Sequence, residues 1–348
     1  MEPGARDRRH RWLALDGARG GAALAVLIFH LHNFGPDPVA AGYRAVDFFF
    51  VLSGFVIAHA YGTRLQTGMS FVAFARARLT RLYPLYLAGT ALGLITVLAV
   101  RPGLTAGPVG IAVTTLSALA MVPAKLAGVR YLFPLDNPAW SLLYELVANA
   151  VFALALGWLK PVRLLQLVVA FLGCLVLVAL IHHNLSVGPK WDRIAIPGAL
   201  VRVGFSFFAG VLIERYRPGW SIRSDLAALG VALAPLGLCL VLPYIGGADL
   251  AIDAVLFPAI VWLGAGVQPR SRVGATGSAE AGRLSYAAYT LHFPILLLMQ
   301  AGLAGRLAPA AAMALTGAAV IVASGLATHL YDEPVRRWFT RRTAREAP

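Results

Sequence analysis

The feature that most restricts the fold of this chain is a succession of apolar stretches, each long enough to cross the hydrocarbon core of a bilayer. Hydrophobic residues make up 59% of the chain and charged residues only 13%, which lies outside the range of a soluble domain. We therefore predict an all-α, polytopic membrane protein with about ten transmembrane helices. Their approximate bounds are 13–31, 43–61, 82–101, 138–159, 163–182, 197–214, 225–243, 250–267, 285–304 and 308–330.

One further apolar stretch, residues 108–124, could be a span, a re-entrant segment or a helix on the outer face. Lysine and arginine accumulate in cytoplasmic loops, so their distribution discriminates between these arrangements. If the stretch does not cross, most of the 30 Lys and Arg residues fall on the cytoplasmic side, whereas fewer than half do so if it crosses. We therefore expect ten spans, both termini in the cytoplasm, and 108–124 as an extra outer segment.

The remaining composition points to a single membrane unit. We expect residues 1–340 to form one domain and residues 341–348 to form a basic cytoplasmic tail. The formal net charge of +14 comes from arginines shared among many short loops, which suits topology and anionic lipid rather than nucleic acid. Cys174 and Cys239 both lie in predicted spans, so no disulfide or metal motif is expected. The basic start is interpreted as part of a retained first helix.

The first predicted span carries two ionisable residues, Arg19 and His30. Charged groups within a bilayer are costly and mark binding sites or transport paths. Eleven residues bring a helix back to nearly the same face, about 16 Å further along its axis. We expect both side chains to face one cavity, with Arg19 in the inner half of the membrane and His30 near the outer surface. Alternatively, Arg19 extends to lipid headgroups and His30 is a boundary residue.

Two other polar positions have a predicted depth but an open choice of partner. Asp47 lies near the outer end of the second span, at the level of His30. It could orient the imidazole of His30, as acid–base catalysis requires, or pair with Arg44 three residues earlier. His292 lies just ahead of Pro294 in the ninth span, where it could bond a carbonyl that the proline leaves without a donor.

A pair of arginines, Arg78 and Arg81, lies three residues apart on one helix face, just before the third span. Two guanidinium groups side by side suit a phosphate or pyrophosphate, because each can bind oxygens bidentately. The same pair is also common as a plain topology signal.

The fourth span begins with Trp140 and Ser141 and carries Glu145 one turn further in. An interfacial tryptophan is ordinary, but a glutamate at this depth must face a partner or a water-filled cavity.

Taken in order, these segments resemble the membrane-bound acyltransferase family 3, which includes bacterial O-acetyltransferases acting on surface polysaccharides. The resemblance covers nearly the whole chain. It rests on the segments LDGARG with Arg19 and His30, VDFFFVLSGFVI with Asp47 and Ser53, RLTRLYP with Arg78 and Arg81, WSLLYE with Trp140, Ser141 and Glu145, LSYAAYTLHFP with His292, and YDEPVRRW with Glu333 and Pro334. The residues after Glu145, LVAN, depart from the family's acidic and aromatic continuation. A short form without a periplasmic esterase-like domain is expected.

The resemblance implies a multi-pass protein of the bacterial inner membrane that takes an acyl group from cytoplasmic acyl-CoA, usually acetyl-CoA. The acceptor would be a hydroxyl of a carbohydrate, and no permanently bound cofactor or metal is implied. In this interpretation Arg19, Arg78 and Arg81 bind the donor. The remaining roles are implied as follows: His30 as general base or acyl carrier, Glu145 or Asp47 holding its tautomer, and Ser53, Trp140, Ser141 and His292 in support.

A different class of function, a glycolipid transporter or flippase without acyl transfer, would also place charges inside the membrane. Such proteins are often built from inverted repeats. The sequence contains no convincing internal repeat, and its polar residues divide into an inner arginine group and an outer group of His, Asp and Glu. This division favours the acyltransferase interpretation.

Overall fold

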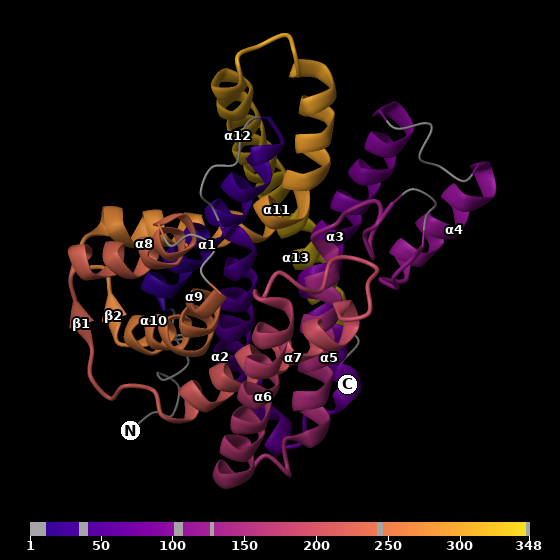
Figure 1. Ribbon diagram of the computed structural model, residues 1–348. Helices are drawn as coiled ribbons and strands as arrows, with labels where there is room; N and C mark the ends of the chain where they lie inside the picture. The colour runs from indigo at the N-terminus through magenta and orange to yellow at the C-terminus, as the bar shows by residue number, and fades with distance from the viewer. Residues whose placement is uncertain (1–11, 35–40, 101–106, 126–128, 242–245, 346–348) are drawn as a thin grey trace.

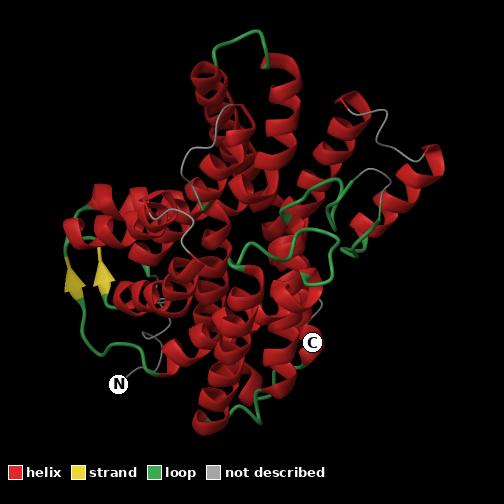
Figure 2. Ribbon diagram, viewed as in Figure 1, coloured by secondary structure: helices red, strands yellow, loops and turns green. Residues whose placement is uncertain are grey.

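The computed structural model describes residues 12–34, 41–100, 107–125, 129–241 and 246–345. The basic amino terminus and the last three residues of the expected tail lie outside these ranges. Helices make up most of the described chain, and strands very little of it (Figure 2). The all-α fold is therefore confirmed.

The elements follow one another without a repeated pattern (Figure 1). The helices are α1 (Leu13–Leu31), α2 (Ala45–Gln66), α3 (Phe71–Val100), α4 (Gly107–Leu119), α5 (Ala139–Ala155), α6 (Pro161–His182), α7 (Ala195–Arg215), α8 (Asp225–Val241), α9 (Gly246–Ala251), α10 (Phe257–Ala265), α11 (Arg272–Leu303), α12 (Pro309–Leu326) and α13 (Glu333–Arg345). π-Helical turns at Ile252–Leu256 and Ala327–Asp332 join α9 to α10 and α12 to α13. The strands β1 (Ile222–Arg223) and β2 (Val267–Gln268) form a short parallel pair.

Over the residues that the structure describes, each of the ten stretches predicted to span the membrane contains one or more helices. Eight of the described helices are long and apolar enough to cross a bilayer, and three apolar helices, α4, α5 and α8, are shorter. Helix α4, with 13 residues, extends about 20 Å, less than the hydrocarbon thickness of about 30 Å. The polytopic membrane fold is confirmed, while the number of crossings and the side of the termini stay predictions.

Helix α1 lies between α11 and α8, and small residues allow this close packing (Figure 1). A Cβ atom added to Gly20 would lie 2.6 Å from the Cβ of Ala281 on α11. One added to Gly21 would clash with the carbonyl oxygen of Ala232 on α8. Small residues of this kind let membrane helices bring their backbones together, so α1 is fixed on two sides.

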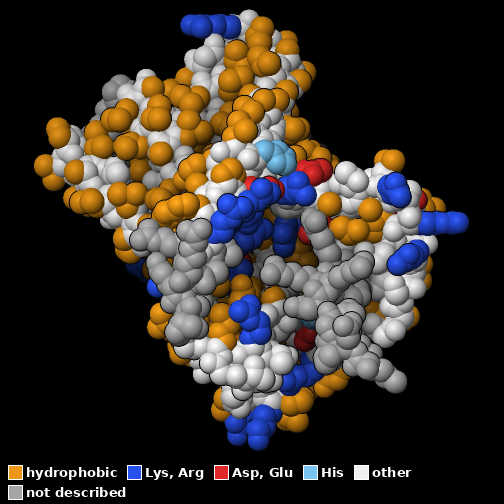
Figure 3. Space-filling model, turned by 180° about the vertical axis from the view of Figure 1, so that it is seen from behind, with side chains coloured by type: hydrophobic (Ala, Val, Ile, Leu, Met, Phe, Trp, Pro, Cys, Tyr) orange, Lys and Arg blue, Asp and Glu red, His pale blue; other side chains and the backbone are white. Residues whose placement is uncertain are grey.

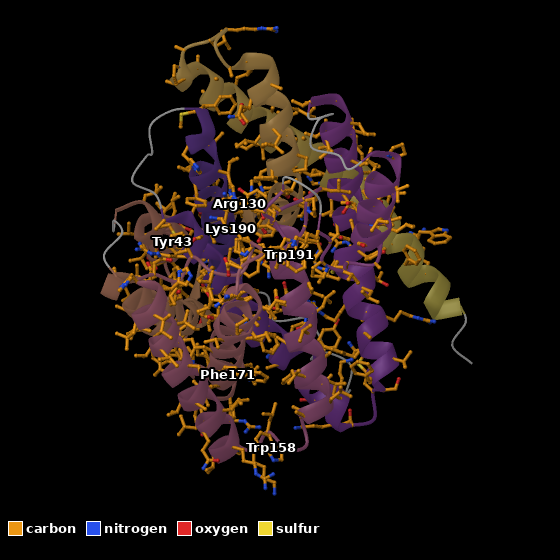
Figure 4. All side chains as sticks on the ribbon, turned by 45° about the vertical axis from the view of Figure 1, so that its right-hand side comes forward. Tyr43, Arg130, Trp158, Phe171, Lys190 and Trp191 are labelled. Atoms are coloured by element: carbon orange, nitrogen blue, oxygen red, sulfur yellow. The ribbon has the colours of Figure 1, made fainter. Side chains whose placement is uncertain are left out.

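Two connecting segments, one before α5 and one after α6, pair with each other near the middle of the molecule (Figure 4). The amide of Trp191 donates to the carbonyl of Arg130 at 2.7 Å, and Figure 4 shows these residues close together beside Lys190. Gly188 in the same segment has φ +123°, and a Cβ there would meet the ring of Trp140 at 2.5 Å. The paired segments therefore hold the start of α5, which carries Trp140 and Ser141.

Candidate active site

An open cavity of about 940 Å³ is lined by α1, α2, α3, α5 and α11. It extends from the predicted cytoplasmic ends of α1 and α2 into the membrane region. Figure 3, which shows the molecule from behind, displays Lys and Arg side chains gathered around a hollow. The described lining contains four arginines, Arg19, Arg64, Arg78 and Arg81, but only two carboxylates, Asp16 and Glu145. The cavity therefore carries an excess of positive charge.

The side chain of Glu145 lies among these arginines. Its Oε1 accepts hydrogen bonds from Nη2 of Arg78 at 3.0 Å and from Oγ of Ser53 at 2.7 Å. The prediction that Glu145 orients His30 is therefore wrong. The physical reason is depth: α5 carries Glu145 one turn beyond Ser141, to the level at which α3 presents Arg78.

The guanidinium groups of Arg19 and Arg81 line the cavity without a side-chain partner. Among the described residues, neither forms a hydrogen bond or an ion pair. An unpaired cation within the membrane region is costly unless an anion or water meets it. Arg19 and Arg81 thus leave two charges available to an anionic ligand.

The cavity closes at Ser141, Tyr289 and Phe49. Ser141 Oγ and Tyr289 OH lie 2.6 Å apart, and the ring of Phe49 meets that of Tyr289 edge-on, with centroids 5.6 Å apart. His30 is not among the described residues that line the cavity. The prediction that Arg19 and His30 face a single cavity is wrong, because Arg19 lines this cavity and His30 does not.

His30 instead meets a second histidine just beyond the closed end. Nδ1 of His30 lies 3.3 Å from Nε2 of His292, and the ring centroids are 4.9 Å apart. The ring of His292 lies 6.0 Å from that of Tyr289, which lines the cavity. One aromatic ring therefore separates the arginine-lined cavity from the histidine pair.

His292 does bind main-chain carbonyls, as predicted, but not the one next to the proline. Its Nδ1 faces the carbonyl oxygens of Tyr289 at 2.9 Å and Ala288 at 3.1 Å. The carbonyl deprived of its helical donor by Pro294 belongs to Thr290. The expected role is thus right in kind and wrong in its partner.

Asp47 belongs to a separate buried charge group. Nε of Arg202 on α7 donates to both carboxylate oxygens of Asp47 at 3.2 Å, and Nη1 donates to the carbonyl of Val187 at 2.6 Å. Arg44 donates through Nε to Asp249 at 2.6 Å. Both predicted partners of Asp47, His30 and Arg44, are therefore wrong.

Sequence reasoning missed Arg202 as the partner, although an arginine within the sixth predicted span, 197–214, required one. Trp140 belongs to the same group, because the guanidinium carbon of Arg202 lies 5.5 Å from the centre of its ring. Trp140 therefore supports a buried arginine and does not line the cavity.

Polar and aromatic residues at the wide end of the cavity were also missed. His59 on α2 lies 3.2 Å from Glu214 through Nδ1, and the ring of Trp12 meets it edge-on at 4.4 Å between centroids. Tyr61 and Arg64 complete this part of the lining, with the guanidinium of Arg64 5.3 Å from the ring of Tyr61. The segment HAYGTR at the inner end of the second span was the available signal.

Comparison with known proteins gives a consistent picture. A family model described as an acyltransferase domain matches residues 12–329. The exopolysaccharide production protein ExoZ of Rhizobium meliloti (strain 1021) is 28% identical over 316 residues, which cover 88% of this chain and 93% of that protein. Protein 2 in the picA locus of Rhizobium radiobacter is 42% identical over 160 residues, covering 41% of this chain and 81% of that protein. No solved structure gives a significant match.

Proposed function

Because this chain belongs to acyltransferase family 3, we propose that it transfers an acetyl group from cytoplasmic acetyl-CoA to a hydroxyl of a carbohydrate. The observation that carries the proposal is the cavity of about 940 Å³, in which Arg19 and Arg81 have no partner among the described residues. A cationic cavity that opens at the predicted cytoplasmic end suits an anionic donor made on that side.

The donor would bind with its phosphates at the arginines. Arg19 and Arg81 can each present two N–H groups to phosphate oxygens. Arg78 adds a third guanidinium, which would bind the phosphates while it also binds Glu145. The pantetheine arm would extend along the cavity towards Ser141 and Tyr289. Since Tyr289 closes that end, its ring must move for the thioester to reach the histidine pair.

His30 would act as the general base, because the unprotonated nitrogen of a neutral imidazole can accept the proton of an acceptor hydroxyl. The acceptor oxygen forms a bond to the acyl carbon, and the bond from that carbon to the thioester sulfur breaks. The hydroxyl proton moves to His30 and then to the departing thiolate of coenzyme A. In this scheme Glu145 and Asp47 stay in their ion pairs and do not touch the reacting atoms.

The carbohydrate acceptor is proposed from two supports. ExoZ, which is similar over most of both chains, is named as an exopolysaccharide production protein. The histidine pair also lies at the end of α1 that the charge distribution places outside, where surface glycans are assembled. The same argument supports a location in the bacterial inner membrane.

The test separates donor binding from transfer. Purified wild-type protein, Arg81→Gln and His30→Ala are compared for acetyl-CoA affinity and for release of free coenzyme A with a polysaccharide acceptor. We expect Arg81→Gln to weaken donor binding about tenfold, the effect of losing about 1.4 kcal/mol. We expect His30→Ala to keep its affinity and to lose about a hundredfold or more in turnover.

Arg272→Gln is the matched control, because Arg272 begins α11 and does not line the cavity. It should match the wild type in both measurements. Unchanged affinity in Arg81→Gln would refute the phosphate assignment. Full transfer by His30→Ala would refute the base assignment, and acyl label trapped on His30 would show that this residue carries the acyl group.

A further inference from the structure

We infer that His292 is the positioning residue for His30, taking the place of the carboxylate that usually orients a catalytic histidine. The inference deepens the proposed function and rests on it. Its starting point is that two histidines meet where a histidine and a carboxylate were expected. Glu145 and Asp47, the two candidate carboxylates, are bound by Arg78 and Arg202.

The hydrogen on His292 is fixed by its own helix. Nδ1 of His292 faces two carbonyl oxygens, those of Tyr289 and Ala288, and carbonyl oxygens only accept. Nδ1 therefore carries the hydrogen. In the neutral ring, Nε2 of His292 is then an acceptor. His292 is only 1% exposed, so water does not compete for these contacts.

The position of the hydrogen on the His30 ring follows from the two acceptors next to its Nδ1. Nδ1 of His30 lies 2.9 Å from the carbonyl oxygen of Val26 and 3.3 Å from Nε2 of His292. The carbonyl oxygen of Val26 can only accept, so Nδ1 of His30 must donate. Its N–H is shared between this oxygen and Nε2 of His292. The chain of hydrogen bonds has one consistent direction, from His30 to His292 and on to the carbonyls of α11.

This direction leaves a lone pair on Nε2 of His30, to which no described residue donates a hydrogen bond. That nitrogen is the one that can take the proton from an acceptor hydroxyl. When it does so, Nδ1–H of His30 remains bonded to His292, and the positive charge of the imidazolium is shared with a neutral acceptor. Phe29 and Phe293 hold the ring edge-on, with centroids 5.0 Å and 5.6 Å from that of His30. The orientation is thus set by packing as well as by hydrogen bonds.

The first experiment reads the tautomer directly. Wild-type protein with ¹⁵N-labelled histidine is reconstituted in lipid nanodiscs, and the His30 signals are assigned by difference with His30→Gln. We expect His30 to be protonated on Nδ1 and unprotonated on Nε2. In His292→Phe we expect the Nδ1 shift of His30 to move, because one of its two acceptors is gone. Protonation on Nε2 in the wild type would overturn the inference.

The second experiment reads the consequence for turnover. His292→Phe should lower kcat about tenfold, the factor expected for loss of one hydrogen bond, with unchanged affinity for acetyl-CoA. His292→Gln keeps a side-chain acceptor and should recover most of kcat. His182→Phe, at the exposed end of α6, is the control and should leave both quantities unchanged.

The outcomes separate the inference from the function on which it rests. Equal kcat in wild type and His292→Phe, or no difference between His292→Phe and His292→Gln, would overturn the positioning role. A wild-type protein that releases no coenzyme A from acetyl-CoA would overturn the proposed function. The ¹⁵N measurement on the wild type would still decide the direction of the hydrogen bonds.

Discussion

At the residue scale, Arg202 shows how this protein keeps a full charge inside the membrane region. Its guanidinium is 1% exposed and donates to Asp47, to the carbonyl of Val187 and to the carbonyl of Tyr43. Three sets of acceptors replace the water that the group loses on burial. Such a pair is costly to assemble and more costly to break, because one charge is then left without its partner.

We predict that Asp47→Asn and Arg202→Gln each destabilise the fold by about 3–5 kcal/mol, the usual cost of breaking a buried ion pair. The double variant should lose less than the sum of the two, since neither charge is then left alone. The measurement is thermal unfolding in detergent.

An exposed ion pair provides the control for these two single variants and their double variant. Arg217 pairs with Glu214 and its side chain is 48% exposed, so Arg217→Gln should change stability by less than about 1 kcal/mol. Additive losses in the double variant would show that Asp47 and Arg202 do not depend on one another.

Sequence reasoning located the site residues better than it located their neighbours. Spacing along a helix fixes the face and depth of a side chain, and Arg19, Arg78 and Arg81, the three residues assigned to the donor, line one cavity. Spacing does not say which other helix lies opposite. Asp47 and Glu145 were therefore assigned to His30 although α7 and α3 present arginines to them.

At the element scale, α2 and α7 cross at two glycines. A Cβ on Gly54 would clash with the carbonyl oxygen of Phe207, and one on Gly210 would clash with that of Val51. These contacts are reciprocal, since each glycine receives the backbone of the other helix. The crossing fixes the position of Asp47 on α2 against Arg202 on α7.

We predict that Gly54→Ala destabilises the protein by about 1–3 kcal/mol, because the added methyl group forces two backbones apart. Thermal unfolding and the yield of monodisperse protein are the measurements. Gly173→Ala is the control: Gly173 lies on α6 with nothing within 4 Å of an added Cβ, so it should be neutral or slightly stabilising. Equal effects of the two substitutions would contradict a close crossing at Gly54.

The existence of the helices was predictable and their mutual arrangement was not. A run of apolar residues of sufficient length gives a helix wherever its neighbours lie, which is why all ten predicted stretches are helical. The pairing of residues 129–138 with 184–194 depends on contacts between distant segments. Neither segment has a hydrophobic period that would reveal it.

At the scale of the whole molecule, the charge distribution predicts which loops face the cytoplasm. In a variant without native cysteines, Leu307→Cys between α11 and α12 should react with a membrane-impermeant maleimide in intact cells. Gly157→Cys between α5 and α6 should react only after permeabilisation. Both positions are exposed, so access decides the labelling. The reverse pattern would place the arginine-lined cavity on the outer side and refute the proposed donor site.

The closure formed by Tyr289, Ser141 and Phe49 has a consequence for the cell as well as for the reaction. A deep, wet cavity in a membrane that stores energy as a proton gradient is a potential leak. Here the arginine-lined cavity ends at a hydroxyl pair and two packed rings, so in the proposed location these side chains would block proton flow through the protein between cycles.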